Sequence, residues 1–199
     1  DRAWTGRQSL YEQVEAALKG GATCIQLREK DLNEEDFLRE SIEMAALCKK
    51  YKVPFLINDN VEIAIKCHAD GVHVGQKDME ASQVRQRVGK DMIIGVSAHS
   101  VEEALEAVKS GADYLGVGAV FSTSTKSDAE VLSRQVLRDI CSAVDIPVVA
   151  IGGISKANIS QLSGTGVDGV ALVSAIFAAE NIEDECCMLR RLSEEMVFQ

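Results

Sequence analysis

The sequence predicts an α/β fold of the (β/α)8 barrel class, formed by residues 1–199 as a single domain. Short apolar runs alternate with segments of helical periodicity along the whole chain, as expected for repeated βα units. The apolar runs are continuous and rich in β-branched residues, which is typical of parallel strands buried on both faces. The repeat is regular and no change of composition marks a second domain. This regularity favours a barrel over the alternative, a doubly wound open sheet.

Each element has a local signal. The first helix ends at Gly20, Asn33 is placed to cap the second, and Pro54 opens the second strand. In the second helix, Phe37 and Ile42 are expected on the buried face. The predicted strands cover residues 23–28, 55–57, 71–74, 92–96, 114–117, 148–151 and 169–173. The predicted helices cover residues 8–20, 34–51, 61–67, 80–88, 101–110, 133–144, 156–163 and most of the chain from Ser174.

A barrel of this class needs eight strands, and the pattern contains seven. The chain begins with a loop and a helix, so we expect the first barrel strand to be missing upstream of Asp1. Without it, or something else that covers the gap, the strands at 23–28 and 169–173 would have unpaired edges. A strand found within residues 1–22 would contradict this expectation.

Composition restricts the partners. The 21 Lys and Arg against 31 Asp and Glu give a net charge of −10, which argues against nucleic acid or an anionic membrane surface. No apolar run approaches the roughly 20 residues that span a bilayer, and no secretory signal is visible. The six cysteines form no Cys-x-x-Cys pair and are expected to be reduced, in a cytoplasmic protein. We expect small-molecule substrates, and a homo-oligomer is compatible with the sequence.

Polar residues or glycines follow every predicted strand. The active site of a (β/α)8 barrel lies at the carboxyl ends of its strands, so these residues should converge although they are far apart in sequence. In chain order they are Arg28 and Lys30, Asn58 and Asp59, Gln76 and Asp78, Ser97, Thr123, Thr125 and Lys126, Gly152 and Gly153, and Ser174.

The charged members of this set suit a diphosphate and a metal ion. Arg28, Lys30 and Lys126 are cations that can bind phosphate oxygens. Asp59 and Asp78 are carboxylates suited to Mg²⁺, which usually takes one or two carboxylates together with substrate phosphates and waters.

The last two strand ends predict a second phosphate site. Gly152 and Gly153, with the amides near Ser174 at a helix N-terminus, resemble the phosphate site common in barrels, and Thr123 and Thr125 could add hydroxyls. Two phosphate sites and a metal suggest two phosphorylated substrates, one of them a diphosphate.

Each signal has a simpler interpretation when taken alone. Asp59 could cap the following helix, Gly152-Gly153 could be a turn, and Lys126 could be a solvated loop lysine. His73 lies within a buried strand and would more often be a packed histidine than a catalyst, although it could line a ring-binding pocket. Their placement at successive strand ends favours a shared site.

The combined motifs resemble the thiamine-phosphate synthase family over nearly the whole chain. The residues that carry the resemblance are 26–30 (Gln-Leu-Arg-Glu-Lys), 57–59, 71–78, 95–97, 123–126, 150–154 and 173–176. The resemblance implies a (β/α)8 barrel that joins a hydroxymethylpyrimidine diphosphate to a thiazole phosphate, releasing diphosphate and forming thiamine phosphate. It implies a dissociative reaction, in which diphosphate leaves before the thiazole nitrogen attacks.

The resemblance also implies residue roles. Diphosphate would be held by Arg28, Lys30, Asn58 and Lys126, Mg²⁺ by Asp59 and Asp78, the pyrimidine by Gln26 and Ser97 with His73 nearby, and the thiazole phosphate by Thr123, Thr125, Gly153, Val173 and Ser174. Arg28, Lys30, Lys126 and Ser97 would be the catalytic residues. One departure from the family pattern is Asn60, where arginine is frequent.

Two rival functions remain at this point. A thiazole tautomerase of the same fold would bind a thiazole phosphate without handling diphosphate. A non-catalytic phosphate-binding barrel of a fused thiamine-pathway protein would keep the glycine site alone. Both rivals could dispense with the cations and carboxylates that this chain combines.

Overall fold

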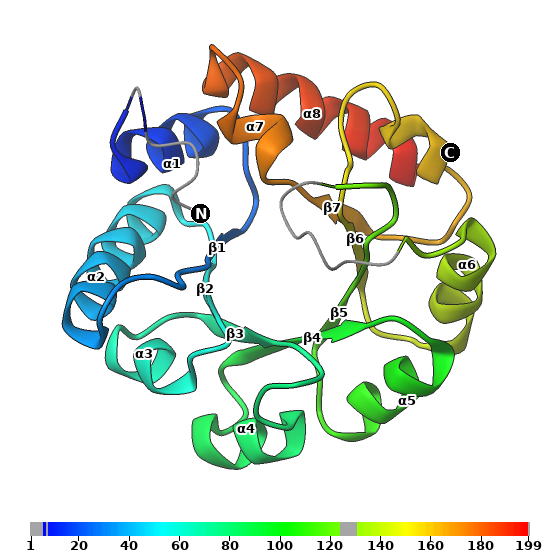
Figure 1. Ribbon diagram of the computed structural model, residues 1–199, viewed down its shortest axis with the longest axis horizontal. Helices are drawn as coiled ribbons and strands as arrows, with labels where there is room; N and C mark the ends of the chain where they lie inside the picture. Colours follow the sequence, from blue (N-terminus) through cyan, green and yellow to red (C-terminus); the bar gives the residue numbers. More distant parts are fainter. Residues whose placement is uncertain (1–5, 7, 124–130, 199) are drawn as a thin grey trace.

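The computed structural model describes residues 6, 8–123 and 131–198, which form a parallel α/β fold. Seven strands lie side by side in chain order, and every neighbouring pair is parallel. The strands are β1 Ile25–Leu27, β2 Phe55–Asn58, β3 Gly71–Val74, β4 Ile93–Ala98, β5 Tyr114–Gly118, β6 Val148–Ile151 and β7 Gly169–Ala171. Figure 1 shows the sheet curling, with the helices around its outer side. The predicted parallel α/β class is confirmed.

The sheet formed by the described residues is open, with β1 and β7 as its two edges. No strand occurs among the described residues before Ile25, so residues 6 and 8–24 supply no eighth strand. A closed barrel is therefore not observed in this part of the chain, which forms a curled seven-stranded sheet.

The helices follow the predicted order. They are α1 Leu10–Lys19, α2 Glu34–Tyr51, α3 Val61–Lys66, α4 Ala81–Val88, α5 Val101–Lys109, α6 Arg134–Ala143, α7 Ser174–Phe177 and α8 Ile182–Val197, with a 3-10 helix, η2, at Ile159–Leu162. Asn33 caps α2 as predicted, because its side chain accepts a hydrogen bond from the backbone N–H of Asp36 at 2.9 Å. None of the helices within the described ranges is both long and apolar enough to cross a membrane.

Two local predictions were wrong. The helix expected over 156–163 is only the short η2, because the Asn158 side chain accepts from Ser155 N–H and donates to Gly153 O, and such bonds compete with helix formation. Ile42 is 51% exposed. The buried face of α2 instead includes Ser41. Its hydroxyl donates a hydrogen bond to the Phe37 carbonyl of the same helix, so the buried polar group is satisfied.

Three aspartates fix the amino ends of the strands. Asp70, Asp113 and Asp168 each come directly before a strand, β3, β5 and β7 respectively. The carboxylate of each accepts a backbone N–H from the preceding strand, at 2.8, 2.7 and 2.8 Å. Charged hydrogen bonds of this kind hold neighbouring strands in register at the end opposite the predicted site.

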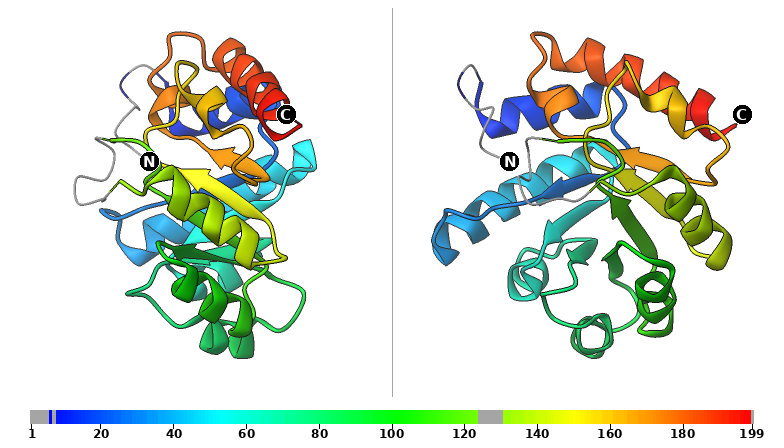
Figure 2. Two further views of the ribbon diagram at one scale, coloured as in Figure 1. Left: turned by 90° about the vertical axis from the view of Figure 1, so that its right-hand side faces the viewer. Right: turned by 45° about the vertical axis from the view of Figure 1, so that its right-hand side comes forward.

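Helices α1 and α8 pack against each other on the flank between the two edge strands (Figure 2). Cys186 of α8 is buried and its thiol donates to the Ala17 carbonyl of α1 at 3.3 Å. A side chain at Gly20 would overlap the α8 backbone, so glycine allows this close approach. The first and last helices thereby tie the two ends of the sheet together.

Candidate active site

Lys30 and Asp59 meet at the carboxyl ends of β1 and β2. Lys30 Nζ lies 2.7 Å from Asp59 Oδ2, although the residues are 29 positions apart. Glu29 shapes the turn that presents Lys30, because its carboxylate accepts the backbone N–H groups of Lys30 and Asp31 at 2.9 and 3.1 Å. The two ion-pair side chains are 52% and 26% exposed, so the pair adds little to stability. The position of the pair at the carboxyl ends of β1 and β2 therefore points to a role in ligand binding.

Asp59 does not cap α3. Its neighbour Asn60 does so, with Oδ1 accepting from Ile63 N–H at 3.0 Å, which gives this departure from the family pattern a structural role. Asp59 itself has a left-handed backbone, φ 64°, and donates its N–H to the His73 carbonyl at 2.7 Å. Left-handed non-glycine residues are uncommon and concentrate at functional sites. The capping interpretation of Asp59 is thus excluded.

Asp78 is the second carboxylate of this cluster. Its Oδ2 accepts the Gly75 N–H at 2.8 Å, which closes the turn after β3. Partial loss of hydration and the adjoining Asp59 carboxyl raise the pKa of Asp78, while Gly75 and Lys30 oppose the shift. Within the described residues no group of three or more His, Cys, Asp or Glu side chains is placed to hold a metal ion, so this site contains a pair of carboxylates. Two adjoining carboxylates fit Mg²⁺, whose other ligands are usually water and phosphate.

A hydrogen-bonded group lies on the inner side of β3, β4 and β5. His73 Nδ1 is 2.8 Å from Tyr114 Oη, and His73 Nε2 is 3.0 Å from Ser97 Oγ. Gln26 Nε2 of β1 donates to Tyr114 Oη at 3.5 Å, and Gln76 Nε2 donates to the Ser97 carbonyl at 2.6 Å. The sequence predicted that Gln26, His73 and Ser97 would meet, but it gave no role to Tyr114, which joins them.

Two glycines make room for these rings. Gly95 pairs in register with Tyr114, and a side chain at Gly95 would overlap the Tyr114 ring. A Cβ at Gly116 would lie 2.9 Å from His73 Cε1. The alternation of a ring on one strand with glycine on its neighbour is the sequence signal that could have identified Tyr114.

The glycine loop after β6 packs against the segment after β5. Gly152 and Gly153 both have left-handed backbones, φ 97° and 67°, and a side chain at Gly153 would overlap the carbonyl of Ser122. Phe121 N–H donates to the Gly152 carbonyl at 3.0 Å. These contacts bring Gly153 beside the segment that leads to Thr123. Thr125 and Lys126 lie outside the described residues.

The remaining predicted residues also follow strand ends. Arg28 is half-buried just beyond β1, and Asn58 is the last residue of β2 and pairs in register with His73. Val173 precedes α7 and Ser174 begins it. Because α7 has only four residues, its macrodipole is small, and the predicted phosphate site depends more on the glycine loop.

Comparison with known proteins assigns the family. A family model described as "Thiamine monophosphate synthase" matches residues 1–176. The chain belongs to the thiamine monophosphate synthase family. Among its relatives, the thiamine-phosphate synthase of Clostridium acetobutylicum is 48% identical over 185 residues, covering 93% of this chain and 88% of that protein. The enzyme of Ruminiclostridium cellulolyticum is 50% identical over 183 residues, covering 92% and 87%.

A solved structure of a family member has the same fold. Thiamine phosphate pyrophosphorylase from Pyrococcus furiosus is 41% identical and superimposes with a TM-score of 0.91, covering 99% of this chain and 94% of that chain. The order and spacing of the strands are thus shared with the thiamine monophosphate synthase family, as the sequence motifs predicted.

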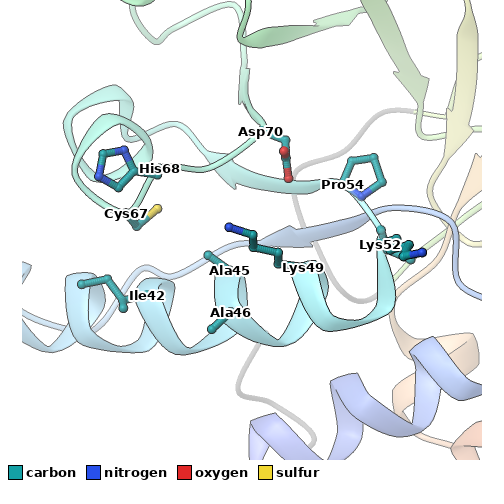
Figure 3. Close-up of a pocket in the computed structure, with 10 residues that line it drawn as sticks. Ile42, Ala45, Ala46, Lys49, Lys52, Pro54, Cys67, His68 and Asp70 are labelled. Atoms are coloured by element: carbon teal, nitrogen blue, oxygen red, sulfur yellow. The ribbon is translucent and has the colours of Figure 1, made fainter.

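A pocket of about 570 Å³ lies elsewhere on the molecule (Figure 3). It is lined by Lys49 and Lys52 at the end of α2 and by His68 and Asp70 before β3. These positions are at the amino ends of β2 and β3, opposite Lys30, Asp59 and Asp78. Active sites of barrel enzymes lie at the carboxyl ends of the strands, so this pocket is not the candidate site.

Proposed function

We propose that the clustered strand ends form the site at which a pyrimidine diphosphate and a thiazole phosphate are joined to give thiamine phosphate. Thiamine-phosphate synthesis is the activity named for the curated relatives. The observation that carries the proposal for the site is the contact of Lys30 with Asp59 beside Asp78, because it combines a cation with two carboxylates at adjacent strand ends.

Lys30, Arg28, Asn58 and Lys126 are the proposed diphosphate ligands. A diphosphate carries several negative charges, and cations at fixed positions stabilise the charge that grows on the leaving oxygen. Asp59 and Asp78 would hold Mg²⁺, which when bound neutralises part of the diphosphate charge. Lys30, which contacts Asp59, would also contact an incoming phosphate oxygen.

Gln26 and Ser97, supported by His73, are proposed to bind the pyrimidine. Their side chains are joined through the hydrogen bonds on the inner side of the sheet. Thr123, Thr125, Gly153, Val173 and Ser174 are proposed to bind the thiazole phosphate, the glycine loop offering backbone N–H groups without a side chain in the way.

In the proposed reaction the C–O bond between the pyrimidine methylene and diphosphate breaks first. The electron pair leaves with the diphosphate oxygen, and the resulting cation is stabilised by the pyrimidine ring. The lone pair of the thiazole nitrogen then forms the new C–N bond. No nucleophilic side chain takes part; Arg28, Lys30, Lys126 and Ser97 are the proposed catalytic residues because they act on the leaving group and on the ring.

We also propose that residues 1–199 form one domain and that this domain belongs to a closed (β/α)8 barrel. Among the described residues, the outer edges of β1 and β7 pair with no further strand, which supports an eighth strand between them. The six cysteines are all free thiols, which supports a reducing compartment such as the cytoplasm. A homo-oligomer is compatible with these proposals.

A single assay tests this function and its rivals. The protein is incubated with pyrimidine diphosphate and thiazole phosphate, with Mg²⁺ or with EDTA, and thiamine phosphate and diphosphate are measured. We expect metal-dependent release of diphosphate only when thiazole phosphate is present. Isomerisation of the thiazole without condensation would select the tautomerase, and binding without any turnover would select the non-catalytic barrel.

A further inference from the structure

Tyr114 joins two residues of the proposed pyrimidine site that do not touch each other. Its hydroxyl contacts Gln26 Nε2 on one side and His73 Nδ1 on the other, and His73 in turn contacts Ser97. The hydrogen bonds run from β1 to β5, then to β3 and β4, across the inner side of the curled sheet.

With Gln26 Nε2 as the donor to Tyr114 Oη, the donors and acceptors of the series follow one direction. An amide –NH2 can only donate, so Tyr114 Oη accepts from Gln26 and its single proton goes to His73 Nδ1. If the His73 ring is neutral, acceptance at Nδ1 places its proton on Nε2. His73 Nε2 then donates to Ser97 Oγ, and the Ser97 proton remains for another acceptor.

The hydroxyl of Tyr114 keeps its proton over the working range of pH. Burial raises the pKa of Tyr114 well above its ordinary range. The ring is also held in place, because Gly95 leaves it space and its centroid lies 5.5 Å from that of His73. Tyr114 is thus a rigid, permanently protonated donor to His73.

We propose that Tyr114 is a positioning residue that sets the tautomer of His73, so that Ser97 presents a hydrogen-bond donor and Gln26 an acceptor to one substrate ring. This inference rests on the proposed function, in which that ring is a pyrimidine with an amino group. An aminopyrimidine offers a ring nitrogen that accepts and an adjacent amino group that donates. The Ser97 hydroxyl matches the ring nitrogen, and the Gln26 carbonyl oxygen matches the amino group.

The tautomer can be read directly in the ligand-free protein. A long-range ¹H–¹⁵N spectrum of the full chain separates protonated from unprotonated ring nitrogens, and comparison with His73→Asn assigns the His73 signals among the three histidines. We expect the proton on Nε2. A proton found on Nδ1 would reverse every hydrogen bond in the series and overturn the proposal.

Two variants test the role of Tyr114. Tyr114→Phe removes only the hydroxyl, and we expect the proton of His73 to lose its preference for Nε2. We also expect KM for the pyrimidine diphosphate to rise about tenfold, while KM for thiazole phosphate changes less than about twofold. Gln26→Glu replaces the donor with an acceptor, which draws the Tyr114 proton away and should move the His73 proton to Nδ1. The matched control is Tyr51→Phe, which removes a hydroxyl bonded to Glu15 at 3.0 Å on the outer helices.

The outcomes separate this inference from the proposed function. An unchanged tautomer in either variant, or an unchanged KM for the pyrimidine diphosphate in Tyr114→Phe, overturns the positioning role. Absence of thiamine phosphate formation by the unmodified protein overturns the proposed function, whereas the tautomer in the ligand-free protein still decides the direction of the hydrogen bonds. If Tyr114→Phe does not fold, the unmodified protein and Gln26→Glu remain decisive.

Discussion

Replacing Asp78 with asparagine should stabilise the metal-free protein and remove its stabilisation by Mg²⁺. The pKa of Asp78 is raised by lost hydration and by the adjoining Asp59 carboxyl, so the ionised form of Asp78 is less favourable in the folded protein than in the unfolded chain. Asparagine keeps an oxygen that can accept the Gly75 N–H, but it removes the charge. The substitution therefore isolates the electrostatic contribution.

The expected magnitude follows from the exposure of Asp78 and from its neighbouring charges. As a general reference, two like charges held about 4 Å apart repel by about 1 kcal/mol in water and about 4 kcal/mol at a protein surface. Asp78 is solvent-exposed and Lys30 offsets part of the repulsion, so we expect a gain of no more than about 1 kcal/mol, or about 2–4 °C in Tm for a chain of this size. Mg²⁺ at 100 times its Kd should add about 2.7 kcal/mol to the unmodified protein, roughly 5–10 °C.

Differential scanning fluorimetry with EDTA and with Mg²⁺ measures both effects. Asp91→Asn is the matched control, because it makes the same chemical change at an exposed position before β4, at the opposite end of the sheet. We expect Asp91→Asn to retain the full Mg²⁺ shift. Equal stabilisation of Asp78→Asn and the unmodified protein by Mg²⁺ would refute the assignment of this carboxylate to the metal.

The raised pKa of Asp78 predicts that the stability of the protein, with and without Mg²⁺, depends on pH. As pH falls through the raised pKa of Asp78, the carboxyl takes up a proton, so the Mg²⁺-dependent rise in Tm should decrease. The metal-free fold should gain stability over the same range, because the folded protein binds this proton more tightly than the unfolded chain does. In Asp59→Asn the metal-free gain in stability should occur at lower pH, since the neighbouring negative charge is gone. A gain over the same pH range in that variant would show that Asp59 does not raise the pKa of Asp78.

Four further substitutions test the site. Gly95→Ala should displace the Tyr114 ring, lowering stability by about 1–3 kcal/mol and raising KM for the pyrimidine diphosphate; unchanged melting and kinetics would show that the ring has spare room. Lys30→Met should lower stability by less than about 1 kcal/mol but raise KM for the diphosphate substrate at least about tenfold, and the opposite pattern would indicate a structural role. Gly153→Ala should destabilise the protein by about 1–3 kcal/mol and weaken thiazole phosphate binding in a titration, which a normal affinity would contradict. Lys126→Ala should lower kcat far more than it weakens thiazole phosphate binding, and unchanged steady-state turnover would remove its catalytic role.

Elements with strong local signals were predictable. The third strand, 71–74, and the second helix, 34–51, have the predicted bounds, because continuous burial and an asparagine cap are encoded by adjacent residues. The segment 156–163 was mispredicted, since the side chain of Asn158 bonds to a neighbouring loop. Local sequence signals also did not show that the described sheet is open, because its two edges, β1 and β7, are far apart in the sequence.

The site was predictable as a set of residues but not as an arrangement. Polar residues at successive strand ends identified Lys30, Asp59 and Asp78 because carboxyl ends of parallel strands share one edge. Which of them touch depends on loop conformation: Asp59 meets Lys30 because its backbone is left-handed and Asn60 takes over the helix cap. No local pattern of charge encodes that choice.

The sequence by itself determined the alternation of strands and helices, the family, and the identity of the polar residues at the strand ends. Only the tertiary structure decided that Tyr114 joins Gln26 to His73 and that Gly95 leaves room for its ring. The physical reason is that alternation along a strand assigns a side chain to one of two faces, whereas strand register and sheet curvature decide which side chains from different strands come within hydrogen-bonding distance.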